Sequence, residues 1–143
     1  MYSEDTLGFY IPVKSHQLLI NNYDMYILGT NCSSHDTSAA IIKDGQVLFA
    51  VEEERLNGKK HTREFPINAI RACLDFADIT INDINIVAVP FIYSDLIQKR
   101  YLNYWAENYP ATIERMLSEM DTVKELLNVE NKIRKTLNFK GEI

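Results

Sequence analysis

Residues 26–53 read YILGTNCSSHDTSAAIIKDGQVLFAVEE and contain three short apolar runs separated by turn-forming residues. Between the last two runs, Asp44 and Gly45 supply the positive φ angles that a two-residue type I′ hairpin requires. These two runs are therefore predicted to pair antiparallel, and the small loop before them indicates a three-stranded antiparallel meander that ends near Glu53. The predicted strands are Tyr26–Asn31, Ser38–Ile42 and Gln46–Val51.

A helix is predicted after the meander, because Phe65-Pro66 places a proline where a first helical turn tolerates it. Apolar residues then recur at helical spacing from Ile67 to Ala77. Ile84–Val89 is rich in strand-forming residues and ends at Pro90, so we expect a fourth strand there. The remainder is expected to be helical, which makes the fold mixed α/β; the predicted helices cover 95–108, 112–129 and 130–137.

The composition is that of one globular domain, with 143 residues of which 46% are apolar and 24% charged. The net charge of −5 argues against nucleic acid as a partner, because a phosphate backbone needs a basic surface. No apolar run reaches the roughly 20 residues of a membrane helix, and no signal-peptide pattern is visible. We therefore expect a cytoplasmic protein without a membrane partner, in which Cys32 and Cys73 are reduced thiols.

The first 24 residues differ from the rest, because they show no sustained period of either a strand or a helix. We predict an amino-terminal extension over residues 1–24 and a domain over residues 25–143, beginning at Met25. The alternative is an ordered arm over 1–24 that packs on the domain.

The loop from Asn31 to Ser38 joins two predicted strands and is crowded with small hydrogen-bonding groups. Hydroxyls and backbone N–H groups in such a turn can surround a phosphate. His35 is suited to move a proton near neutral pH. The alternative is a polar hairpin loop in which Asp36 and Ser38 hydrogen-bond their own backbone.

An acidic strand end, Glu52 to Arg55, leads into a basic stretch, Lys59 to Arg63. Lysine is a mobile point charge suited to a phosphoryl or carboxylate group. Lys60 and His61 precede a predicted helix start, where the helix dipole also favours anions. The alternative is a solvated loop whose surface ion pairs contribute little.

Two further patterns are assigned to structure rather than to chemistry. One segment in and around the helix predicted over 95–108 is rich in aromatic residues. Packing explains these residues better than stacking on a base or sugar. They are Tyr93, Tyr101, Tyr104, Trp105 and Tyr109. The three histidines include no i, i+4 pair and the cysteines lack zinc spacing, so no metal site is predicted. The sequence also contains no P-loop and no dinucleotide fingerprint.

The order of the motifs closely resembles the start of the NodU/CmcH-type O-carbamoyltransferases, which act in nodulation-factor and antibiotic biosynthesis. The resemblance is strong over residues 25–90 and rests on these segments: ILGTN at 27–31, SHDTSAA at 34–40, KDG at 43–45, EEER at 52–55, KKHT at 59–62 and FP at 65–66. It implies a Kae1-like domain of the actin, Hsp70 and sugar-kinase superfold, which has a ribonuclease H-like core. A YrdC-like domain follows in that family.

The family resemblance also implies a reaction and roles for individual residues. Carbamoyl phosphate and ATP give a carbamoyl-adenylate, and the carbamoyl group then passes to a hydroxyl of a small-molecule acceptor. His35 is then the candidate base for that hydroxyl, with Asp36 beside it in the catalytic loop. Lys60 is expected to hold a phosphate or carbamoyl group, and the other expected substrate contacts are Asn31, Ser38 and His61.

Two departures from the family pattern limit what this chain is expected to do alone. Leu56-Asn57-Gly58 stands where the family usually reads Phe-Thr-Arg, so a planar cation is missing from the loop. The histidine-rich motif for a divalent metal or iron and the nucleotide-binding parts are not present up to Ile143. We expect an N-terminal part of such an enzyme that is inactive alone, binds no metal tightly, and is completed by a separate or missing remainder, which would be a partner polypeptide. The alternatives are a stand-alone binding or regulatory remnant and an unrelated actin-like ATPase or sugar-kinase lobe.

Overall fold

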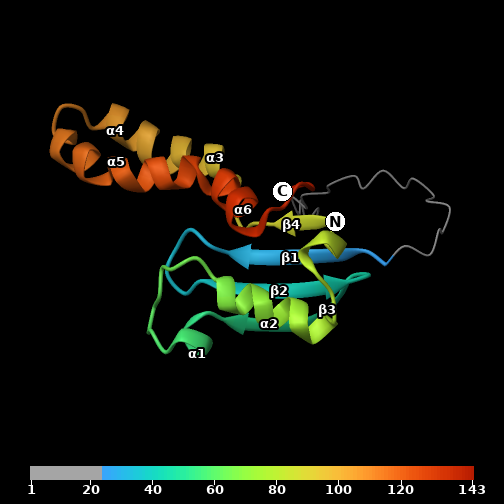
Figure 1. Cartoon of the computed structure of the whole chain (residues 1–143). Coiled ribbons are helices and arrows are strands. Elements are labelled where there is room, and N and C mark those ends of the chain that lie inside the picture. Colours follow the sequence, from blue (N-terminus) through green and yellow to red (C-terminus); the bar gives the residue numbers. More distant parts are fainter. Residues whose placement is uncertain (1–23) are drawn as a thin grey trace, which may run out of the picture.

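Four strands form one sheet in the computed structural model, which describes residues 24–143 (Figure 1). The sheet order is β3-β2-β1-β4, in which β1 pairs antiparallel with β2, β2 pairs antiparallel with β3, and β4 lies parallel to β1. The predicted meander is therefore confirmed. The strands are β1 (Tyr26–Asn31), β2 (Ser38–Lys43), β3 (Gln46–Glu52) and β4 (Ile86–Ala88).

The β2–β3 hairpin turns where the sequence predicts it. Asp44 has φ 50° and Gly45 has φ 83°, so both central residues take the positive φ of a type I′ turn. The Asp44 carboxylate also accepts a hydrogen bond from the backbone N–H of Met25 at 3.0 Å. This bond ties the start of β1 to the turn.

The helices follow the predicted order with differences at their ends. The long helix predicted over 95–108 begins earlier, at Tyr93, and contains a π-helical turn at Gln98–Leu102 between α3 and α4. The fourth strand is shorter than predicted, because a 3₁₀ turn at Ile81–Asp83 precedes it and Pro90, which lacks an N–H, follows it. The helices are α1 (Glu54–Asn57), α2 (Ile67–Ala77), α3 (Tyr93–Ile97), α4 (Asn103–Glu107), α5 (Ile113–Leu127) and α6 (Val129–Leu137).

One face of the sheet carries the main core. Leu28 pairs in register with Ile41 and Val87, and alternation along each strand places these side chains on the same face. All three are fully buried, and they pack with Ile70 of α2 and Ile133 of α6. In Figure 1, α2 lies across β2 and β3, while α6 lies beside β1 and β4.

A second, smaller core lies between the helices that project from the sheet in Figure 1. Tyr101 and Trp105 are buried there and make an edge-to-face aromatic contact at 5.7 Å between ring centroids. The interpretation of the aromatic stripe as packing is confirmed for these two rings, whereas Tyr109 is 72% exposed. The other buried members of this core are Ile97, Val123 and Leu126.

Both cysteines are free and buried. Burial raises the pKa of the Cys32 and Cys73 thiols to about 11, so both stay protonated at neutral pH. Within residues 24–143, no helix has the length and apolar character needed to cross a membrane. The predicted extension over 1–24 falls almost entirely outside the described residues and stays a prediction.

Candidate functional site

The loop between β1 and β2 is held in shape by Asn31, the last residue of β1. Its side-chain amide donates hydrogen bonds to the carbonyl oxygens of His35 at 3.3 Å and Asp36 at 3.2 Å. Asp36 has φ 57°, a conformation that few residues other than glycine adopt. The Asn31 amide thus fixes the part of the loop that carries the predicted catalytic residues.

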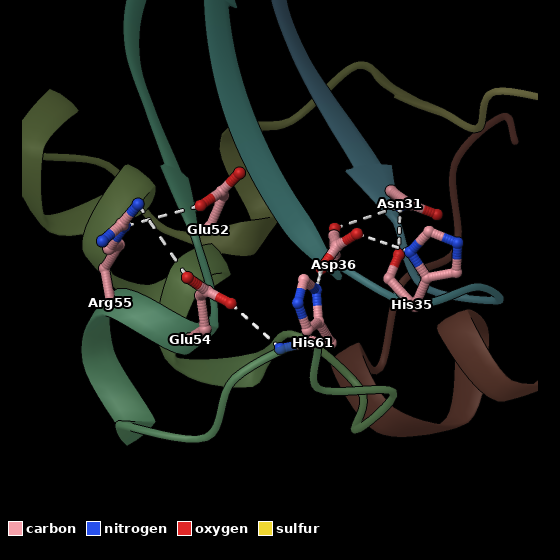
Figure 2. A network of polar contacts seen from close by, with 7 residues as sticks. All are labelled: Asn31, His35, Asp36, Glu52, Glu54, Arg55 and His61. Atoms are coloured by element: carbon pink, nitrogen blue, oxygen red, sulfur yellow. Dashed lines mark hydrogen bonds and ion pairs between the residues drawn. The ribbon is translucent and has the colours of Figure 1, made fainter.

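Asp36 lies at the centre of the network shown in Figure 2. Its Oδ2 is 2.5 Å from Nδ1 of His35, and its Oδ1 is 2.8 Å from Nδ1 of His61. The pKa of the Asp36 carboxyl is lowered, first by the hydrogen bond from His35 and then by the one from His61. The carboxylate is therefore charged at neutral pH and orients both imidazole rings, which are 63% and 78% exposed respectively.

The other side of the network comes from the start of α1. Glu54, whose side chain is only 11% exposed, accepts a hydrogen bond from the backbone N–H of His61 at 3.0 Å. Its second oxygen is 3.9 Å from Nη2 of Arg55, and Arg55 also lies 3.5 Å from Glu52 (Figure 2). The acidic run and the basic stretch, separate in sequence, therefore meet at His61.

These contacts bring together three side chains that could bind a metal ion, which their spacing in the sequence does not reveal. Asp36, Glu54 and His61 each place one donor atom so that the three atoms lie within 4.8 Å of one another. The sequence spacing predicts no metal site, because the three residues come from separate segments and share no spacing motif.

Sequence reasoning missed Glu53, the most deeply buried charged residue of the part of the chain that the structure describes. It is 1% exposed, and its carboxylate accepts hydrogen bonds from the backbone N–H of Ala69 at 2.8 Å and from the Asn68 amide at 2.5 Å. An acidic group at the first turn of α2 also satisfies the helix dipole. The signal was present, because Phe49, Val51 and Glu53 alternate along β3 and its end and therefore point to the core face.

Asn31 and Ser38 pair across β1 and β2 and line a broad hollow of about 730 Å³. The hollow lies over the sheet face opposite Leu28 and Ile41 and is floored by small residues, Gly29, Ala40, Ala50 and Ala88. The side-chain oxygen of Asn31 is buried and has no hydrogen-bond partner among the described residues. Two of the predicted substrate contacts therefore share one surface, beside the histidine network.

Lys60 is not brought into this network. It is exposed in the turn before His61, and no ion pair or hydrogen bond of its side chain is found within residues 24–143. Its neighbour Lys59 instead contacts Glu64 at 2.5 Å. The roles expected of Lys60 and of the other predicted site residues stay predictions.

The family resemblance implies two bound groups, a divalent metal or iron and ATP. The cluster of Asp36, Glu54 and His61 has the donor types of a divalent metal site. The hollow has Arg55 as the one cation among its lining residues, and Arg55 already lies beside Glu52. The lining of this hollow thus offers no free cation for a triphosphate.

Comparison with known proteins agrees with the family resemblance noted in the sequence. Residues 26–139 match the model of the family described as carbamoyltransferase N-terminus. The nodulation protein NolNO of Sinorhizobium fredii is 45% identical over 58 residues, which are 41% of this chain and 8% of that protein. The uncharacterized protein sll1178 of Synechocystis is 29% identical over 121 residues, 82% of this chain and 19% of the relative.

A third relative is the uncharacterized 19.2 kDa protein in the syrM 5′ region of Rhizobium etli. It is 38% identical over 68 residues, covering 48% of this chain and 37% of that protein. The chain thus spans between 8% and 37% of the length of these three relatives. Because the family match extends over most of its residues, the chain belongs to the carbamoyltransferase N-terminus family.

Proposed function

We propose that this chain provides the first strands and the acceptor-side loop of an enzyme that transfers a carbamoyl group to a hydroxyl. The donor is carbamoyl phosphate, and the acceptor is a small molecule of nodulation-factor or antibiotic-like secondary metabolism. Family membership supports the transferase chemistry, and similarity to a nodulation protein supports the class of acceptor. The remaining parts of such an enzyme would come from further polypeptide.

The contact between His35 and Asp36 is the observation that carries this proposal. With Asp36 ionised, Nδ1 of His35 carries the hydrogen of the 2.5 Å bond, and Nε2 is left as the proton acceptor. A histidine oriented by a carboxylate is the usual arrangement for activating a hydroxyl. His35 is exposed enough, at 63%, for an acceptor hydroxyl to approach it.

Lys60 is proposed to attract the anionic carbamoyl donor. Lys59 is engaged by Glu64, whereas the Lys60 ammonium has no partner within the described part of the chain. The next residue, His61, is fixed to Asp36 at 2.8 Å. A donor bound by Lys60 would therefore lie close to the loop that holds the proposed base.

We also propose that the sheet belongs to an actin-like, ribonuclease H-like subdomain. An antiparallel meander followed by a helix and a strand parallel to β1, in the order β3-β2-β1-β4, supports this topology. The parallel pairing of β4 requires the crossover that α2 supplies.

The test places the substitutions in a complete enzyme that contains this segment. His35→Ala is expected to lower carbamoyl transfer to the acceptor by about 10²–10⁴-fold, the usual contribution of a positioned base. Carbamoyl-phosphate-dependent pyrophosphate release should be largely retained, because it precedes the transfer step. Lys60→Ala is expected to weaken use of carbamoyl phosphate, while Lys59→Ala serves as the matched control. Unchanged rates in both assays would instead support a binding or regulatory role for this segment.

A further inference from the structure

A second chemistry is built into the network around Asp36, apart from the proposed proton transfer. Asp36 lies in the β1–β2 loop, Glu54 begins α1, and His61 lies in the turn before α2. Their donor atoms lie within 4.8 Å of one another. We propose that these three side chains bind one divalent first-row transition-metal ion.

The spacing of the donor atoms is close to what such an ion requires. Ligand atoms lie about 2.0–2.2 Å from zinc, so two neighbours in a tetrahedral arrangement are roughly 3.3–3.6 Å apart. Oδ1 of Asp36 and Nδ1 of His61 are 2.8 Å apart. The pair must therefore open by about 0.5–0.8 Å to admit the ion.

The donor types favour a transition metal over magnesium or calcium. One imidazole nitrogen and two carboxylate oxygens suit zinc, iron or manganese, whereas magnesium and calcium prefer oxygen alone. Two carboxylates also balance the charge of a divalent cation. Three protein ligands leave at least one position open, as in catalytic metal sites.

The surroundings orient the ligands. Glu54 is 11% exposed and is fixed by the backbone N–H of His61 at 3.0 Å. The second oxygen of Asp36 is occupied by His35, which orients the carboxylate in the way that outer partners orient metal ligands. His61 is 78% exposed, so an ion can reach the cluster from solvent.

This site differs from the histidine-rich motif that the family resemblance leads us to expect, because it contains one histidine and draws on three separate segments. It places a Lewis acid beside the proposed base, but its metal binding is independent of whether His35 acts as that base. Binding can therefore be measured on the chain itself, without any carbamoyl transfer.

The experiment is calorimetric titration of the chelator-treated, tag-free full chain with Zn²⁺. We expect one Zn²⁺ per chain and weaker binding of Mg²⁺. Asp36→Asn, Glu54→Gln and His61→Ala are each expected to lower Zn²⁺ affinity by at least about tenfold, since even outer-shell changes cost about 10–100-fold. The matched control is Asp121→Asn, whose side chain is 90% exposed and pairs with Lys124. It should leave the affinity unchanged.

Two calorimetric outcomes would overturn the proposal. One is the absence of saturable Zn²⁺ binding by the unsubstituted chain. The other is binding that falls only with His61→Ala, since this would mark an isolated surface histidine. NMR of the imidazole rings in the unsubstituted chain avoids the risk of misfolded variants. One equivalent of Zn²⁺ must shift the His61 ring signals, and unshifted signals would equally refute the site.

Discussion

Asp36 is the residue on which the site depends, because one carboxylate holds two imidazoles. The short contact with His35 and the longer one with His61 use its two oxygens separately, at 2.5 Å and 2.8 Å. The Asp36 carboxylate therefore couples the two imidazoles. This coupling links the proposed base to the residue next to Lys60.

The charge state of Asp36 can be measured directly. Its folded-state pKa lies below the ordinary value of 3.8, because both hydrogen bonds stabilise the carboxylate. The resulting stabilisation is complete above pH 3.8 and is lost as the pH falls through the lower, folded-state pKa. We expect a carboxyl NMR titration to show a midpoint below 3.8 that rises in His35→Ala and in His61→Ala.

Asp83 provides an internal control for that titration. Its pKa is also lowered, but by hydrogen bonds from the backbone and hydroxyl of Thr80. Its midpoint should stay low in both histidine variants. If the Asp36 midpoint is the same in both histidine variants as in the unsubstituted chain, the network of Figure 2 does not persist in solution.

At the scale of elements, Glu53 connects three of them. Its backbone N–H donates to the carbonyl of Thr37 at 2.8 Å, directly after Asp36. Its carboxylate accepts from the first turn of α2, and its main chain joins β3 to α1. The loop that carries Asp36 is thereby attached to the helix that covers the sheet.

Glu53→Gln is expected to destabilise the fold by about 1–3 kcal/mol, because the Gln amide keeps one acceptor oxygen and presents its NH₂ group to the other of the two donors, Ala69 N–H and the Asn68 amide. Urea unfolding followed by circular dichroism measures this change. Glu52→Gln is the matched control on the neighbouring, exposed residue, and it should stay within about 0.5 kcal/mol. Equal effects of the two substitutions would mean that burial of the Glu53 carboxylate contributes nothing to stability.

The elements also show what the sequence could and could not predict. The meander and α2 were predictable, because Asp44-Gly45 and Phe65-Pro66 are local signals read within a few residues. Helix α1 was not predicted, since four residues are too few for a helical period to be visible. The histidine network was predicted only as a list of candidates, because the contact between Asp36 and His61 spans 25 residues.

At the scale of the whole molecule, residues 24–143 form two hydrophobic cores. The sheet, α2 and α6 share one core, and the helices from α3 to α5 share the other. Tyr93 packs against both, and its hydroxyl lies 2.8 Å from that of Ser33 in the β1–β2 loop. The projecting helices therefore touch the loop of the candidate site through Tyr93.

This division predicts that the helical core can open without the sheet. Trp105 is 7% exposed, and its indole N–H donates to Glu119 at 3.1 Å, so Trp105→Ala should cost about 3–5 kcal/mol within that core. Native-state hydrogen exchange should then show lost protection in α3 to α5 and retained protection in β1 and β2. The control is Ile41→Ala, in the centre of the main core, which should lower protection in the sheet as well.

If Trp105→Ala lowers protection in β1 as much as in α5, the two cores unfold as one cooperative unit. In that case the contact between Ser33 and Tyr93 would belong to a rigid connection, and the shape of the β1–β2 loop would depend on the stability of the whole chain.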